Sequence, residues 1–168
     1  IRAFDVAGNV SEDSQCKFTI DLSNPVASID EPKPEENSSI VFVKDIPVFR
    51  GQANDGAVTL GKKAQSAELT YTKDGGNVEE VPAGSRESEF NWDQESGTWT
   101  WIPTSSQFNG TGKYDVTLKV TDDTGKITTV SRTVSLDTNV PTIKFTQVNP
   151  YIDKVNPEDG YFVNGEIS

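Results

Sequence analysis

Residues 112–137 read GKYDVTLKVTDDTGKITTVSRTVSLD, which is the clearest pattern of paired strands in the chain. Its first run alternates apolar and polar residues, which is typical of a strand with one buried face. The apolar positions are Tyr114, Val116, Leu118 and Val120. A turn sequence, Asp122-Asp-Thr-Gly125, follows, and a second run rich in Thr and Val comes after it. The stretch therefore predicts a hairpin of two long strands.

The second strand of this hairpin has a less regular pattern. Its apolar residues are Ile127, Val130, Val134 and Leu136, and the step from Ile127 to Val130 breaks the two-residue period. One extra residue in a strand shifts the alternation in this way, so the pattern predicts a β-bulge between Ile127 and Val130.

The rest of the chain reads as shorter strands separated by turns rich in Gly, Pro, Asn and Asp. Strands are expected within residues 25–29, 40–53, 66–82 and 89–103, with breaks at 45–47, 74–76 and 95–97. No run has the period of a helix of three or more turns. The sequence therefore predicts an all-β protein.

Two distant parts of the chain resemble each other. Residues 1–29 and residues 118–145 each contain a strand, an Asp-x-x-Gly turn, a second strand and then Asp-x-x-x-Pro. The paired positions are Gly8 and Gly125, Asp21 and Asp137, and Pro25 and Pro141, at spacings of 117, 116 and 116 residues. Residues 46–55 likewise resemble residues 160–168. A repeat of roughly 115 residues has the size of one β-sandwich domain.

This period divides the chain into three parts. Residues 1–22 are expected to be the last hairpin of a preceding unit, residues 23–139 a complete unit, and residues 140–168 the first strands of a following unit. The chain then reads as a window on a longer array, and its incomplete ends are expected to promote association. The alternative is that the two ends pair with each other in a composite sandwich.

The quoted motifs resemble those of bacterial immunoglobulin-like domains. The resemblance rests on "IRAFDVAGN" with "FTIDLSNP", on "LKVTDDTGK" with "VSLDTNVP", and on "GTWTWIP" followed by "GKYDV". It implies an immunoglobulin-like antiparallel β-sandwich, repeated in tandem, in a large cell-surface or secreted adhesin-like protein of bacteria. The partners implied are the neighbouring repeats of the same chain. Thr124-Gly125-Lys126 departs from the Ala-Gly-Asn that is frequent in the family.

Composition excludes several classes of function. The net charge of −11 makes nucleic acid an unlikely partner, because phosphate binding needs Lys and Arg. No stretch approaches the roughly 20 apolar residues of a membrane span. The chain has no His and one Cys, Cys16, which is expected to be a small buried strand residue. With no base to activate a nucleophile, no enzymatic activity and no catalytic residues are expected.

Calcium binding is the chemistry for which the sequence offers ligands. The candidate oxygen donors lie in turns and linkers and are Asp5, Asp21, Asp122, Asp123, Asp137 and Asn139. The resemblance to calcium-stiffened repeat modules implies a site at a junction between units, formed by Asp137 and Asn139 with carboxylates of a neighbouring loop. The simpler interpretation is that these side chains accept hydrogen bonds from backbone N–H groups of their own turns. Both interpretations stay open at the level of sequence.

The first functional hypothesis is a rigid, non-catalytic structural spacer in such an array. The second is a module that binds a glycan or a host or cell-surface protein. Its candidate residues are Trp92, Lys62 and Lys63, whereas Trp99 and Trp101 share one strand face and are expected in the core. Coplanar aromatic rings facing solvent would favour glycan binding, and buried tryptophans would favour a structural spacer. A third hypothesis is an accessory module of a large secreted hydrolase.

Overall fold

The computed structural model describes residues 1–18, 20–56 and 62–143, and within them every regular element is a strand. The strands are β1 Val26–Ala27, β2 Ile40–Val43, β3 Phe49–Asn54, β4 Ser66–Lys73, β5 Glu79–Val81, β6 Asn91–Asp93, β7 Thr98–Trp101, β8 Gly112–Thr121 and β9 Ile127–Leu136. Each lies, to within one residue, in a segment expected to be extended from its alternation pattern. No helix among the described residues is long and apolar enough to cross a membrane.

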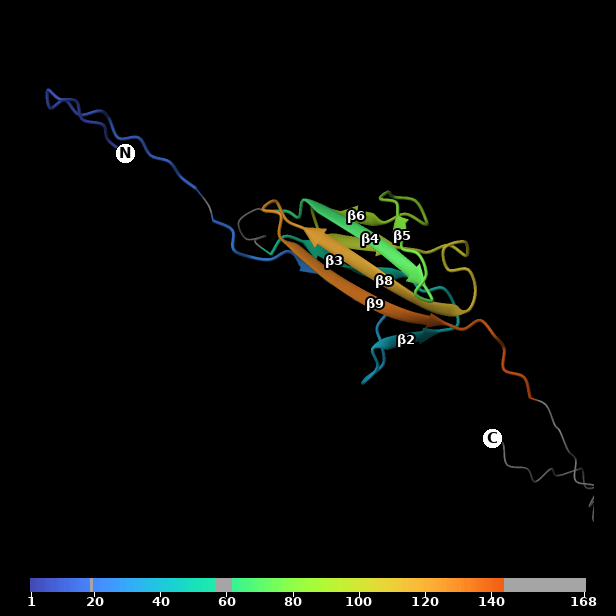
Figure 1. Ribbon diagram of the computed structural model, residues 1–168. Coiled ribbons are helices and arrows are strands. Elements are labelled where there is room, and N and C mark those ends of the chain that lie inside the picture. Colours follow the sequence, from blue (N-terminus) through green and yellow to red (C-terminus); the bar gives the residue numbers. More distant parts are fainter. Residues whose placement is uncertain (19, 57–61, 144–168) are drawn as a thin grey trace, which may run out of the picture.

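The strands form two sheets that face each other as a sandwich (Figure 1). One sheet has the order β1-β3-β7-β6, and the other has the order β2-β9-β8-β4-β5. These are the two sheets of the immunoglobulin-like fold, with the first strand of that fold divided between β1 and β2. Among the nine strands of the described residues, every pairing is antiparallel except that of β2 with β9, which is parallel. The expected immunoglobulin-like β-sandwich is confirmed, and one of its two sheets is mixed rather than purely antiparallel.

Aromatic side chains fill the space between the sheets. Trp99 and Trp101 are 2% and 0% exposed, which confirms that both belong to the core. The ring of Trp101 contacts the rings of Phe49 and Phe108, with centroids 5.2 and 5.7 Å apart. The ring of Phe108 in turn stacks on Tyr114 at 3.9 Å. Large buried rings of this kind supply much of the apolar area that stabilises a small sandwich.

Tyr114 also anchors a turn. Its hydroxyl donates a hydrogen bond of 2.9 Å to the carbonyl oxygen of Gly110, four residues upstream. Immunoglobulin-like sandwiches characteristically have a tyrosine with this hydrogen bond near the start of the strand equivalent to β8, where it fixes the loop between the sheets.

The hairpin of β8 and β9 is continuous, and the expected bulge is wrong. The register runs without interruption from Gly112 opposite Leu136 to Thr121 opposite Ile127. Ile127 faces solvent with 55% of its surface exposed. The alternation is broken because Ile127 faces outward and the inward position beside it holds Thr128, whose hydroxyl donates a hydrogen bond to the carbonyl of Pro25. Arg132, also at an inward position, donates a hydrogen bond to the carbonyl of Ile29.

Gly51 allows β1 to lie close to β3. A Cβ atom at this position would lie 2.0 Å from the carbonyl oxygen of Ser28 and 3.0 Å from Nε1 of Trp99. That indole nitrogen donates a hydrogen bond of 3.1 Å to the same Ser28 carbonyl. The absence of a side chain at residue 51 therefore creates the space in which the first strand is bound.

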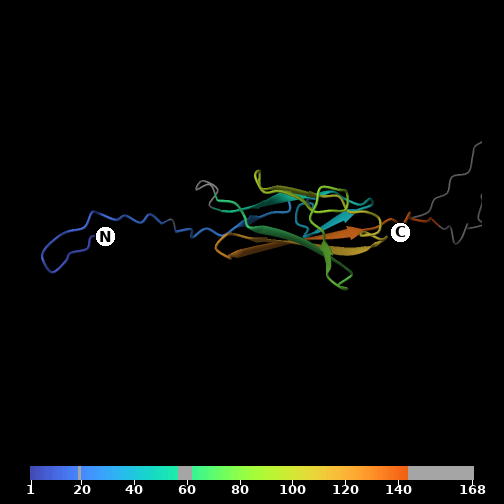
Figure 2. The same ribbon diagram turned by 90° about the horizontal axis from the view of Figure 1, so that it is seen from above.

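The chain enters and leaves the sandwich at opposite ends (Figure 1 and Figure 2). We call these ends the N-terminal pole, which residues 20–25 reach first, and the C-terminal pole, from which residues 137–143 lead away. The turn between β8 and β9 lies at the N-terminal pole, since β9 ends at the C-terminal pole.

Residues 1–18 lie outside the sandwich as an exposed hairpin, in which Phe4 pairs with Val10. Cys16 is exposed there, so its expected burial is wrong. The apolar side chains of residues 1–18 are exposed, because among the described residues no sheet packs against this hairpin. The strands expected for a following unit fall almost entirely in residues 144–168, outside the described residues.

Candidate functional site

Three carboxylates meet at the N-terminal pole. One oxygen atom from each of Asp21, Asp55 and Asp122 lies within 4.8 Å of the other two. Asp21 belongs to the incoming linker, Asp55 follows β3, and Asp122 begins the turn between β8 and β9. We call these three residues the acidic cluster. Both Asp55 and Asp122 have no exposed surface.

The turn geometry of the hairpin fixes Asp122. Its Oδ1 atom accepts hydrogen bonds of 2.8 Å from the backbone N–H and the hydroxyl of Thr124 and from the backbone N–H of Lys126. Burial by itself raises the pKa of Asp122, but these hydrogen bonds outweigh it and lower the pKa to about 2. The turn therefore holds a fully ionised carboxylate in the interior at neutral pH.

Asp21 carries the cluster into the linker. Its Oδ1 atom accepts a hydrogen bond of 2.8 Å from the backbone N–H of Ser23, which forms a tight turn. Its Oδ2 atom is buried and has no hydrogen-bond partner among the described residues. A buried carboxylate oxygen without a donor is costly unless a cation or a water satisfies it.

Two lysines compensate part of the negative charge. The ammonium group of Lys126 lies 3.3 Å from Oδ2 of Asp122 and donates hydrogen bonds to the backbone carbonyls of Asp21 and Ser23, at 3.0 and 2.7 Å. Lys62 forms an ion pair with Asp123 next to the cluster. The hydrogen bond from Lys62 to Asp123 and the charge of Asp123 raise the pKa of Lys62. The charges of Asp21 and Asp55 raise this pKa further.

The acidic cluster offers the ligand chemistry of a hard divalent cation. Ca²⁺ is bound by six to eight oxygen atoms, and carboxylates and backbone carbonyls are its usual protein ligands. Asp21, Asp55 and Asp122 fit that donor set, with the remaining positions open to carbonyl groups and water. Asp21, Asp55 and Asp122 bring three carboxylates to one place, where the ammonium group of Lys126 forms an ion pair with Asp122.

The structure brings together two of the residues that the sequence singles out, Asp21 and Asp122, and places Asp123 beside them. Asp137 and Asn139 lie at the C-terminal pole, where Oδ1 of Asp137 accepts a hydrogen bond from the backbone N–H of Asn139. Asp5 lies in the turn of the N-terminal hairpin and caps it, as the simpler interpretation expects.

Asp55 is the member of the cluster that the sequence reading missed. The triplet Asn54-Asp55-Gly56 reads first as a turn signal. The missed signal is parity, because Phe49, Gly51 and Ala53 all face inward and Asp55 continues that series. Because every second side chain of a strand points to the same face, the Asp55 carboxylate is directed to the same interior as Phe49, Gly51 and Ala53.

The candidate ligand-binding residues are engaged within the module. Trp92 packs against the core, and its Nε1 donates a hydrogen bond of 2.8 Å to the carbonyl oxygen of Ala53. Lys62 pairs with Asp123 and Lys63 pairs with Glu95. These side chains thus contribute to the packing and loop contacts of the N-terminal pole and β6.

No protein-family model matches the chain.

Proposed function

We propose that this chain is a non-catalytic spacer module from a tandem array of β-sandwiches in a large bacterial cell-surface or secreted adhesin-like protein. The observation that carries the proposal is that the chain enters at one pole and leaves at the other (Figure 2). A module with this geometry extends an array by its full length. A module with both ends at one pole would form a branch instead.

Local structure supports the repeat on which the proposal depends. Asp21 and Asp137 begin identical linker turns, because Oδ1 of each accepts a hydrogen bond from the backbone N–H two residues later, at 2.8 and 2.9 Å. Their spacing of 116 residues is the repeat length read from the sequence. Similar linkers on both sides of a sandwich are what an array of equivalent units requires.

The incoming linker is fastened to the module, which supports a stiff array. Lys126 binds two carbonyl groups of the linker. Gly56 also faces the linker closely, since a Cβ atom there would lie 2.2 Å from the carbonyl oxygen of Asn24. A linker held by its own backbone leaves little freedom for one unit to swing against the next.

The tryptophans favour the spacer over a glycan-binding module. Trp99 and Trp101 are buried, and Trp92 is half-buried with its indole nitrogen bonded inside the module. Stacking of a sugar ring needs an exposed aromatic face. The alternatives to the spacer are binding of a glycan or a protein through the loops and an accessory role beside a hydrolase.

A second property follows from the acidic cluster. We propose that Asp21, Asp55 and Asp122 bind a divalent cation, with Ca²⁺ as the best match, and so tie the linker to the module. The buried Oδ2 atom of Asp21 favours this proposal, because it has no hydrogen-bond partner among the described residues. Thermal melting in chelator and in millimolar Ca²⁺ tests it; an unchanged melting temperature would refute calcium binding and leave the spacer proposal intact.

Sedimentation velocity tests the spacer itself. The samples are polypeptides of the parent protein with one, two and three consecutive units. End-to-end units raise the frictional ratio with each addition. A ratio that stays at the value of a globular protein would mean that the units fold back on one another, and it would overturn the proposal.

A further inference from the structure

We propose that β9 is a load-bearing strand, which holds the incoming chain through its side chains and thereby resists tension between the two poles. This inference rests on the proposed spacer function and goes beyond it, because a spacer can separate two objects without withstanding force. In the structure, the segment that enters at the N-terminal pole lies against β9, the strand that leads out of the C-terminal pole.

Three side chains of the β9 region bind the backbone of the incoming segment, residues 21–29. Lys126 donates hydrogen bonds to the carbonyls of Asp21 and Ser23, as described above. Thr128 donates through its hydroxyl to the carbonyl of Pro25 at 2.6 Å. Arg132 donates through Nη2 to the carbonyl of Ile29 at 2.8 Å. We call Lys126, Thr128 and Arg132 the side-chain clamp.

The order of these contacts sets the direction of loading. Going along β9 from residue 126 to residue 132, the partners advance from residue 21 to residue 29, so the two segments run in the same direction. The incoming segment continues out of the N-terminal pole, whereas β9 continues out of the C-terminal pole (Figure 1). Tension on the two ends therefore slides these segments past each other. Bonds across two sliding segments are strained together rather than one after another.

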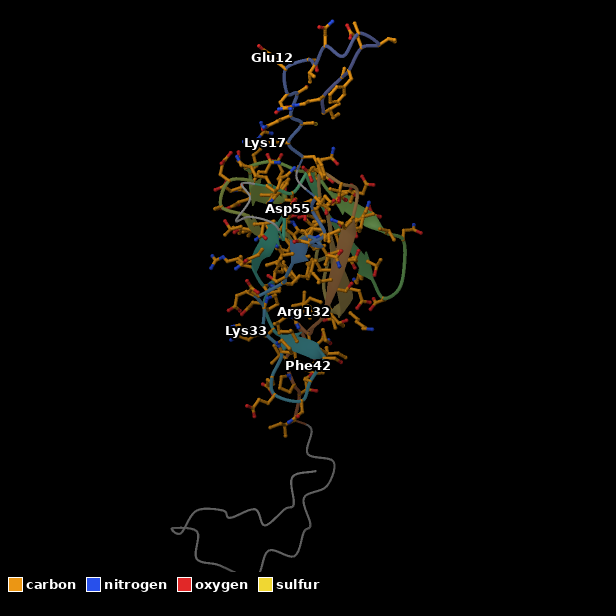
Figure 3. The ribbon with its side chains drawn as sticks, turned by 90° about the vertical axis from the view of Figure 1, so that its left-hand side faces the viewer. Glu12, Lys17, Lys33, Phe42, Asp55 and Arg132 are labelled. Atoms are coloured by element: carbon orange, nitrogen blue, oxygen red, sulfur yellow. The ribbon has the colours of Figure 1, made fainter. Side chains whose placement is uncertain are left out.

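The backbone of β2 continues the same arrangement toward the C-terminal pole. Ile40 to Val43 pair in parallel with Thr133 to Leu136, and the carbonyl oxygen of Val43 accepts a hydrogen bond of 2.9 Å from the backbone N–H of Asp137. Figure 3 shows Asp55 and Phe42 on opposite sides of Arg132 along the module. The clamp and the β2 ladder thus attach residues 21–29 and 40–43 along nearly the whole length of β9.

The inward face of β9 explains why the clamp is specific to this strand. A core strand of a sandwich ordinarily places apolar residues at every inward position. Thr128 and Arg132 occupy inward positions opposite Val120 and Val116 of β8, whose side chains are fully buried. On the inward face of β9, the polar side chains of Thr128 and Arg132 lie where backbone carbonyl groups of the incoming segment can accept their hydrogen bonds.

Force spectroscopy on the full chain, tethered through its two termini, tests the inference. The rate of forced unfolding reports the barrier rather than the equilibrium stability. At constant force, Thr128→Val and Arg132→Met are expected to unfold about tenfold faster than the parent, which corresponds to about 1.4 kcal/mol of barrier. Thr129→Val is the matched control, because Thr129 is exposed on the same strand, and its rate should equal that of the parent.

A second pair of variants tests the backbone ladder. Neighbouring residues of a strand point their backbone groups to opposite sides, and the Val43 carbonyl faces β9, so the Val43 N–H faces β9 and the Phe42 N–H faces away. Val43→Pro is expected to speed forced unfolding. Phe42→Pro, at a position 74% exposed, should leave the rate unchanged.

The direction of pulling separates load bearing from ordinary stability. Handles on Asn77→Cys and Val140→Cys, in a Cys16→Ser background, lie toward the C-terminal pole and pull β9 away from its neighbours without sliding it along the incoming segment. We expect the parent to unfold at lower force along this axis, with the Thr128→Val and parent rates equal. Equal forces along both axes, or clamp variants as strong as the parent in the end-to-end direction, would overturn the inference. Neither result would alter the sedimentation of consecutive units, so the spacer proposal would stand or fall separately.

Discussion

Asp5 and Asp122 lie 117 residues apart and make the same turn. In each case Oδ1 accepts a hydrogen bond of 2.8 Å from the backbone N–H four residues later, which belongs to Asn9 or Lys126. In each case the backbone carbonyl also accepts a hydrogen bond from a glycine three residues later, Gly8 or Gly125, at 3.1 and 3.2 Å. Both glycines have positive φ, at 84° and 83°. One turn lies outside the sandwich and the other closes it, as expected if both end equivalent units.

Replacement of Gly51 is expected to detach the first strand. Gly51→Ala would place a Cβ atom 2.0 Å from the Ser28 carbonyl oxygen, so β1 has to move away from β3. We expect a loss of about 1–3 kcal/mol in the free energy of unfolding, measured by urea denaturation. Gln52→Ala, at an exposed position on the same strand, should change it by less than about 0.5 kcal/mol. Equal effects of the two substitutions would show that the close approach has no energetic weight.

Ionisation of Asp122 should make the module sensitive to acid. The pKa of Asp122 falls from 3.8 to about 2 on folding, so its contribution to stability is complete above pH 3.8 and is lost as the pH falls through about 2. Asp122→Asn is therefore expected to be less stable at neutral pH and to show a flatter pH profile between pH 4 and 2. Chemical denaturation in the presence of a chelator measures this profile. Asp45→Asn, an exposed substitution, should preserve the slope of the parent.

Removal of the Tyr114 hydroxyl tests the turn anchor. Tyr114→Phe keeps the ring that stacks on Phe108 but removes the hydrogen bond to Gly110. We expect a loss of about 0.5–1.5 kcal/mol in the free energy of unfolding. Tyr71→Phe is the control, because its ring lies in the same cluster and no hydrogen bond of its hydroxyl is present among the described residues. A neutral Tyr114→Phe substitution would mean that the turn holds without this bond.

Calcium binding by the acidic cluster predicts a distinct effect of Asp55. Asp55→Asn keeps the size of the side chain but removes one of the three charges, so we expect at least a tenfold weaker apparent affinity for Ca²⁺. Isothermal titration with Ca²⁺ measures this affinity, and Asp45→Asn again serves as the control. Unchanged calcium binding by Asp55→Asn would place the ion elsewhere.

Local patterns in the sequence predicted most of the strands correctly. The alternation at Tyr114 to Val120, the break around Pro47 and the glycine turn at Gly75 each depend on a few neighbouring residues, and each is present in the structure. Burial of Trp99 and Trp101 likewise followed from their two-residue spacing.

Relationships between distant residues were not predictable in the same way. The parallel pairing of β2 with β9 joins segments about 93 residues apart, as at Val41 and Val134, and no local pattern specifies it. The sequence predicts a bulge between Ile127 and Val130 because the apolar Ile127 faces outward and the inward position beside it holds Thr128, whose partner, the carbonyl of Pro25, lies on the incoming segment. Asp55 belongs to the acidic cluster because the fold brings the linker and the β8–β9 turn next to it, and this proximity cannot be seen in the sequence.

In the proposed array, consecutive units extend end to end at a fixed spacing, and small-angle X-ray scattering of two-unit and three-unit polypeptides measures that spacing. The ten residues of β9 span about 33 Å at the usual rise per residue. We therefore expect the maximum dimension to grow by about 35–45 Å from two units to three. A maximum dimension that stays nearly constant as units are added would contradict it.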